Sequence, residues 1–238
     1  MFDATVSDGV LRLARPDARW LSTGFDGGER RADAAYNVTV PEGWDHTDLA
    51  DYVTERRADA GFDADGPALL TGVSQRHARV ARRGPATAVA TAGLSNPAPL
   101  FAADAESAGH ETASDDAPPV GTVNVFVGVE RSLAPGALSN LVAVAASAKA
   151  ATLSREAGFP GTTTDAVVAA CGPDVERARF SGTGTAVGAA ARACVRDAVR
   201  ASLDSRYADE EEAMPDSVAD ARHGVAPVPE ADVEVFEP

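Results

Sequence analysis

The segment VGTVNVFVGV, residues 120–129, is a strongly apolar run of the kind that forms a buried strand. It leads into LAPGALSNLVAVAASAKAATLSREA, residues 133–157, where apolar residues recur at helical spacing. Pro135 suits the first turn of a helix, and Gly158 suits the position just after its end. The centre of the chain is therefore predicted to be a buried strand followed by one long helix.

The segments around this centre predict more strands than helices. Residues 164–171, TDAVVAAC, should form another buried strand, and residues 177–181 a strand that pairs with it. A second long helix is expected from about residue 185 to about residue 205. An N-terminal helix should end near residue 60, capped by Asp45 or Thr47. The strands expected before the centre cover residues 10–14, 20–23, 36–40, 68–73 and 87–92.

The order of these elements predicts the fold class. Strands follow one another without regular alternation with helices, which favours an α+β domain with a mixed, largely antiparallel sheet and long packed helices. The same order suggests an αββα layered sandwich. We expect one domain over residues 1–206, with a solvated acidic loop at 102–119, followed by an acidic, proline-containing tail at 207–238.

The composition describes the solvent of the protein more than its function. The 238 residues carry a net charge of −15, and Lys149 is the one lysine among 21 basic residues. In molar salt such a charge costs little, because repulsion is screened over a few ångströms, so we expect a salt-adapted protein. The chain has no basic stripe for nucleic acid, no targeting segment and no run of about 18 apolar residues to span a membrane, which predicts a cytoplasmic protein.

The residue types that usually hold metals or form triads are sparse. The two cysteines, Cys171 and Cys194, lie in apolar surroundings without CxxC spacing, which favours buried free thiols. The four histidines are scattered along the chain. The sequence therefore predicts no metal site, and it supports neither a zinc hydrolase nor a Ser-His triad.

Lys149 is the first candidate for chemistry. It follows Ala145 by four residues and Leu138 by eleven, which places it on the apolar stripe of its helix. A lysine among small residues on a buried face could act as a base or donate to a developing oxyanion. The alternative is a side chain that extends along the helix to reach solvent.

Asp165 is the second candidate, at the entrance of a strand and after a hydroxyl-rich turn that includes Thr164. It could orient Lys149 or activate water, or it could only stabilise the turn. Two further asparagines are candidates. Asn96, next to Ser95 in a polar turn, could bind a substrate amide or donate to an oxyanion. Asn124, inside the apolar strand, needs a buried partner, and substrate is one candidate.

The segment SGTGTAVG, residues 181–188, lies between a strand and a helix. Its glycines and the helix N-terminus could cradle a phosphate or an oxyanion, with Gly182, Thr183 and Thr185 as the binding residues. The segment lacks the lysine of a P-loop and the order of a Rossmann fingerprint. A plain helix cap by Thr183 or Thr185 is the alternative.

Five of these segments together resemble the adenosylcobinamide amidohydrolase family. They are TAGLSNP (91–97), GTVNVFV (121–127), AKAATL (148–153), GTTTDAVVAAC (161–171) and SGTGTAVG (181–188). The resemblance covers roughly residues 10–200. It implies an enzyme that hydrolyses the amide between the aminopropanol arm and the corrin ring of adenosylcobinamide, giving adenosylcobyric acid and (R)-1-amino-2-propanol.

The resemblance also shapes the expected site and its partners. Cobalt belongs to the corrinoid substrate, so no cofactor is expected, and a homo-oligomer is compatible with the sequence. Lys149 and Asp165 are the acid and base candidates, and Asn96 with Thr183 and the glycine loop are oxyanion candidates. Water is the preferred nucleophile, with Ser95 or Thr164 as covalent alternatives. Two other readings stay open: a corrinoid-binding protein without catalysis, and a phosphate- or nucleotide-binding enzyme that uses residues 182–188.

Overall fold

The computed structural model describes residues 1–41, 44, 48–100, 122–173, 177–208, 213–215, 220–221 and 234–237. Eight strands form one sheet in the order β4-β3-β2-β9-β7-β6-β5, with β1 paired to β2. The pairs β7–β9 and β3–β4 are parallel, and the other pairs of this sheet are antiparallel. The strands are β1 (Asp3–Ser7), β2 (Val10–Ser22), β3 (Gly28–Thr39), β4 (Ala68–Thr71), β5 (Arg79–Arg83), β6 (Ala86–Ala92), β7 (Val123–Val129) and β9 (Ala166–Cys171).

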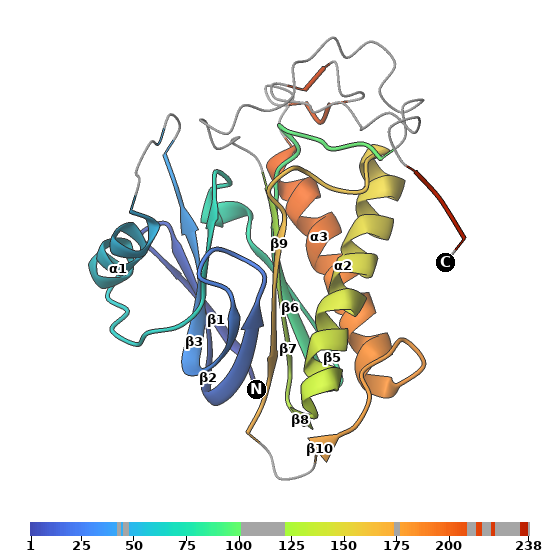
Figure 1. Cartoon of the computed structure of the whole chain (residues 1–238). Coiled ribbons are helices and arrows are strands. Elements are labelled where there is room, and N and C mark those ends of the chain that lie inside the picture. Colours follow the sequence, from blue (N-terminus) through green and yellow to red (C-terminus); the bar gives the residue numbers. More distant parts are fainter. Residues whose placement is uncertain are drawn as a thin grey trace.

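The helices are α1 (Leu49–Asp59), α2 (Pro135–Ala157) and α3 (Ala186–Arg206), with a short 3-10 helix η1 at Gln75–His77. Figure 1 shows α2 and α3 side by side along the sheet and α1 on the far side. A small second sheet pairs β8 (Ser132–Leu133) with β10 (Arg177–Ala178). The mixed sheet and packed helices confirm the predicted α+β class.

Alternation along the strands divides the core into layers. On β7, Val123, Val125, Val127 and Val129 pack with α2 and α3, whereas Phe126 points the other way and packs with Trp20 of β2. The outer face of β2 and β3 packs in turn against α1 and its neighbours. The layers therefore run α1, β2–β3, β6–β7–β9, α2–α3, which is the suggested αββα order. Both β layers belong to one hydrogen-bonded sheet.

A bulge in β2 lets one strand serve both β layers. The register with β3 shifts between Ala14 and Ala18, where Asp17 has a φ of 52°. Before the bulge β2 also pairs with β1, and after it Arg19–Ser22 pair with β9. A bulge bends its strand, so the predicted break between residues 14 and 20 is a bend inside a single strand.

Several expectations need correction. Residues 177–181 do not pair with residues 164–171: β10 pairs in parallel with β8 instead. The cap of α1 is Asp48, which accepts from the N–H of Asp51, rather than Asp45 or Thr47, which lie outside the described residues. Strands β1 and β5 were not expected, because β1 is short and mostly exposed, and the arginines of β5 hide its apolar signal, as is common at sheet edges. The acidic loop at 102–119 and most of the tail at 207–238 also lie outside the described residues.

Helix α2 differs from the expectation that no segment is apolar enough to span a membrane. By length and composition it is apolar enough to cross one, although half of its apolar window is buried inside the protein. Its buried residues pack against β7, β9 and α3. The core helix of a soluble protein has the same character, so this feature is weak support for a membrane segment.

Candidate active site

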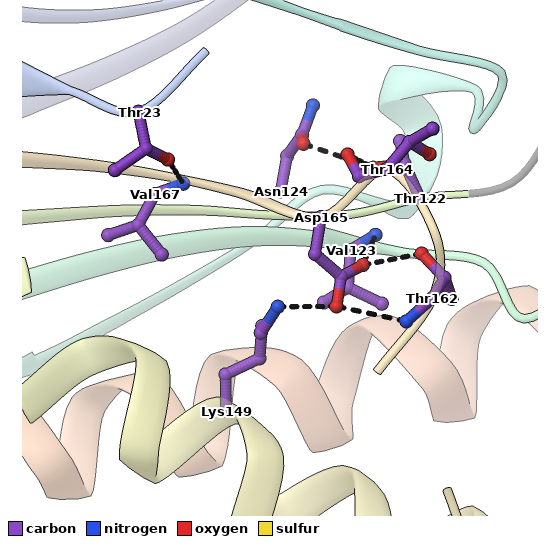
Figure 2. Close-up of polar contacts among 9 residues, drawn as sticks. All are labelled: Thr23, Thr122, Val123, Asn124, Lys149, Thr162, Thr164, Asp165 and Val167. Atoms are coloured by element: carbon purple, nitrogen blue, oxygen red, sulfur yellow. Dashed lines mark hydrogen bonds and ion pairs between the residues drawn. The ribbon is translucent and has the colours of Figure 1, made fainter. Parts of the chain in front are cut away.

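Two charged side chains meet where α2 passes the start of β9. Lys149 Nζ donates to Oδ2 of Asp165 in an ion pair whose side chains are 9% and 10% exposed. Figure 2 shows Lys149 reaching up from the helix toward the carboxylate on the sheet. Asp165 comes just before β9, on the same face as Val167 and Ala169, which pack against the helices. The prediction that Lys149 faces inward is therefore confirmed.

The Asp165 carboxylate is filled with hydrogen bonds. Its Oδ1 accepts from the N–H of Val123 at 2.9 Å and from the Thr162 hydroxyl. Its Oδ2 accepts from the N–H of Thr162 at 3.0 Å and from Lys149. A carboxylate with four donors has little capacity left to take a proton from water. Of the two roles expected for Asp165, the geometry favours orienting Lys149.

The Lys149 ammonium has N–H bonds that Asp165 does not use. An ammonium group has three N–H bonds, and in the part of the chain that the structure describes, Asp165 is the partner that Nζ contacts. The ion pair with Asp165 leaves Lys149 able to donate further hydrogen bonds. The site is therefore suited to stabilising an oxyanion.

Gly161 packs over this ion pair. A Cβ added there would lie 2.5 Å from Oδ2 of Asp165 and 3.9 Å from Nζ of Lys149. Its φ is outside the left-handed region, so the requirement for glycine is one of space. Only a residue without a side chain leaves the carboxylate where Lys149 meets it.

Asn96 is held against the same turn. Its side-chain Nδ2 donates to Oγ1 of Thr163 at 2.6 Å, and its backbone carbonyl accepts from the N–H of Thr163 at 3.2 Å. The next residue, Pro97, forms a β-bridge with Thr162. Asn96 is 0% exposed, and within the described part of the chain its Oδ1 has no hydrogen-bond partner. The neighbouring Ser95 is half-buried. The structure thus brings Asn96 and Ser95 to the turn that holds Asp165.

Asn124 faces the other side of its strand, between the two β layers. Its Nδ2 donates to Oδ1 of Asn37 at 2.8 Å and to the carbonyl of Leu70 at 2.9 Å, and its Oδ1 accepts from Thr122 at 3.2 Å. Its hydrogen-bonding capacity is used by the protein, which favours a structural role over substrate binding. The Thr122 hydroxyl shares its single proton between Asn124 Oδ1 and the carbonyl of Thr164, which lies 2.8 Å from Thr122 Oγ1 (Figure 2). Thr164 itself is exposed.

The segment at 181–188 lies near the other end of α2. Ser181 Oγ donates to the carbonyl of Ala137 at 2.6 Å and accepts from Asn140 at 3.1 Å. Asn140 precedes Lys149 by nine residues, a rise of about 13 Å along an α-helix. Within the segment, Thr185 caps α3 by accepting from the N–H of Gly188 at 3.0 Å, as the simpler alternative predicted.

The other members of that segment are also used locally. The Gly182 carbonyl accepts from the Thr185 hydroxyl at 2.8 Å, and Thr183 Oγ1 accepts from Arg192 at 3.4 Å. The structure therefore does not bring Gly182, Thr183 or Thr185 to Lys149. Sequence spacing carried no signal for this separation, because it depends on which end of the sheet each loop occupies.

A Ser-His contact that sequence reasoning did not find lies beside β5. His77 Nδ1 is 3.1 Å from Oγ of Ser205, and its Nε2 accepts from Nε of Arg76 at 2.8 Å. The neutral ring must then carry its proton on Nδ1 and donate it to the serine, so this pair cannot activate Ser205. Burial, followed by the charges of Arg76, Arg206 and Arg79, lowers the pKa of His77.

Within the described ranges, no three His, Cys, Asp or Glu side chains lie where they could hold a metal ion. Cys171 and Cys194 are buried free thiols, as predicted, and burial raises the pKa of both. The absence of a cofactor stays a prediction.

Comparison with known proteins adds to this geometry. A family model described as adenosylcobinamide amidohydrolase matches residues 3–211. The adenosylcobinamide amidohydrolase of Halobacterium salinarum is 56% identical over 240 residues, with all of both chains covered. That of Methanosarcina mazei is 26% identical over 204 residues, covering 82% of this chain and 94% of the relative. Among solved structures, the PH0078 protein from Pyrococcus horikoshii OT3 matches with a TM-score of 0.42 and 13% identity, covering 84% of this chain and 78% of that one.

Proposed function

The chain belongs to the adenosylcobinamide amidohydrolase family, and we propose from this that it hydrolyses the aminopropanol amide of adenosylcobinamide. The products are adenosylcobyric acid and (R)-1-amino-2-propanol, and the acid can re-enter coenzyme B12 synthesis. The 56% identity over the full length of both chains is the observation that carries this proposal. The buried Lys149–Asp165 pair gives the proposal a chemical centre.

The reaction needs few groups. A water oxygen bonds to the amide carbon, and the carbonyl oxygen becomes an oxyanion. Lys149 donates one of its remaining N–H bonds to that oxygen, while Asp165 holds the ammonium group in place. The C–N bond then breaks, and both protons of the attacking water end on the nitrogen, which leaves as an ammonium. The corrinoid keeps the water oxygen in a carboxylate.

Lys149 is well placed for this role for two reasons. Its side chain is 9% exposed, so its charge is little screened by water. Its position is fixed by a carboxylate that is itself held by backbone N–H groups of Val123 and Thr162. A donor that is held in position before the reaction starts stabilises the transition state without reorganisation.

The cellular location and the partners of the enzyme are inferred from its composition and from its relatives. We propose a salt-rich cytoplasm as its location, supported by the −15 net charge and the Halobacterium relative. The corrinoid is the expected partner, and it carries its own cobalt, so no resident cofactor is proposed. Binding to nucleic acid or membrane is not expected, and a homo-oligomer is compatible with this function.

The direct test is incubation of the purified protein with adenosylcobinamide in molar potassium chloride, with chromatography of corrinoids and amines. We expect adenosylcobyric acid and aminopropanol in equal amounts. Lys149→Met should lower the rate by about 10²–10³-fold, the usual effect of removing one oxyanion donor. Ser147→Met, on the exposed face of the same helix, is the matched control and should keep the wild-type rate. Corrinoid binding without release of amine would instead support the non-catalytic reading.

A further inference from the structure

We propose that Asn96 acts as a hydrogen-bond acceptor for the N–H of the scissile amide, and so selects amides over esters. This inference rests on the proposed hydrolysis and assigns one side chain of that site. Of the two roles that the sequence suggested for Asn96, it selects binding of the substrate amide over donation to an oxyanion.

The orientation of the Asn96 amide carries the argument. Its Nδ2 is engaged with Oγ1 of Thr163 at 2.6 Å, so its donor side faces the protein. The residue is 0% exposed, and its Oδ1 has no hydrogen-bond partner among the residues that the structure describes. Nearly all buried polar atoms in folded proteins are paired, and an orphan calls for an explanation such as a ligand. The missing partner of an amide oxygen must be a donor.

The position of Asn96 relative to Lys149 supports the same ligand. Both side chains are tied to one short turn: Lys149 through Asp165 to Thr162, and Asn96 directly to Thr163. The Pro97–Thr162 bridge keeps the two strands of this corner together. The corner thus presents one cationic donor and one neutral acceptor. A secondary amide has the complementary pair, a carbonyl oxygen that accepts and an N–H that donates.

The acceptor also suits the step that breaks the bond. As the tetrahedral intermediate collapses, the nitrogen gains a proton and keeps its own N–H while the C–N bond breaks. An acceptor on the nitrogen side holds the N–H throughout, and Lys149 holds the oxygen. An ester has no N–H, so Asn96 Oδ1 would stay unpaired when an ester is bound.

The test compares two substrates and several variants. The substrates are adenosylcobinamide and its analogue with an ester oxygen in place of the amide nitrogen. Asn96→Ala should lower kcat/KM for the amide by about 10–100-fold and leave that for the ester nearly unchanged, because only the amide loses a hydrogen bond. Asn96→Asp should retain most amide hydrolysis, because one carboxylate oxygen can accept from Thr163 and the other from the substrate.

Controls separate this role from a structural one. Thr163→Ser keeps the hydroxyl that orients Asn96 and should keep the amide preference, whereas Thr163→Val should reduce it. Ser147→Asp places a carboxylate on the exposed face of α2 and should leave both rates unaltered. Thermal unfolding of each variant reports folding.

The outcomes are distinct. Equal losses on amide and ester for Asn96→Ala would overturn the acceptor role, even if Asn96→Asp failed to fold. An inactive Asn96→Asp that is folded would also overturn it and would favour a donor role. A wild-type protein that leaves adenosylcobinamide intact would instead contradict the proposed function itself.

Discussion

Lys149 Nζ donates to Oδ2 of Asp165 between α2 and the start of β9, although sixteen residues separate them in the chain. The two partners differ in what else they hold. Lys149 contacts Asp165, whereas Asp165 also accepts from Val123 and Thr162. The pair is therefore asymmetric, and its two deletions should have different effects on stability.

Asp165→Ala should destabilise the protein more than Lys149→Met. Without the carboxylate, a buried ammonium and two backbone N–H groups lose their acceptor, which should lower the free energy of unfolding by about 3–5 kcal/mol. Without the lysine, the carboxylate keeps three donors, so we expect a loss of about 1–2 kcal/mol. Urea unfolding in molar salt, followed by the fluorescence of the buried Trp20, measures both. Equal losses would argue against this asymmetry.

Gly161→Ala should impair catalysis through the ion pair. The new Cβ would lie 2.5 Å from Asp165 Oδ2, so the carboxylate must shift and Lys149 with it. We expect a fall in kcat of about 10²-fold, as when a positioning contact is displaced by about 1 Å. Gly136→Ala is the matched control, because a Cβ there meets nothing within 4 Å. Gly136 lies in α2, the helix that carries Lys149. A normal kcat for Gly161→Ala would show that the pair tolerates displacement.

Thr185→Ala should cost stability but not activity. Its hydroxyl caps α3 by accepting from the N–H of Gly188, and loss of such a cap costs about 1 kcal/mol. Because this segment contacts the N-terminal part of α2, far from Lys149, kcat/KM should match the wild type. Thr185→Ser should retain the cap and the stability. A loss of activity in folded Thr185→Ala would indicate that residues 181–188 belong to the active site.

His77 should make stability depend on pH in the neutral range. Its pKa is lowered from 6.5 by burial and by nearby arginines, so the folded state resists protonation that the unfolded chain accepts. The unfolded state then binds more protons below about pH 6.5, and stability is full above that pH and falls as the pH falls. His77→Gln should flatten the dependence of the melting temperature between pH 7.5 and 5.5. If the melting temperature of His77→Gln depended on pH as in the wild type, the pH dependence would arise from other titratable groups.

The sequence by itself determined the local elements and the direction of Lys149. Helical spacing around Lys149 is a property of neighbouring residues, and it placed the side chain on the buried face before any contact was known. The central strand and the long helices were recognised for the same reason, whereas the family was recognised from the resemblance of whole segments. The apolar run around Asn124 also marked this residue as buried, but not which side chain would pair with it.

Only the tertiary structure decided which of these residues share a site. Sheet order and register bring Asp165 and Asn96 to one turn beside Lys149, pair Asn124 with Asn37 across the layers, and leave residues 181–188 near the opposite end of α2. The physical reason is that periodicity fixes the face on which a residue lies, whereas the edge at which a loop emerges depends on pairing between strands that are distant in the chain.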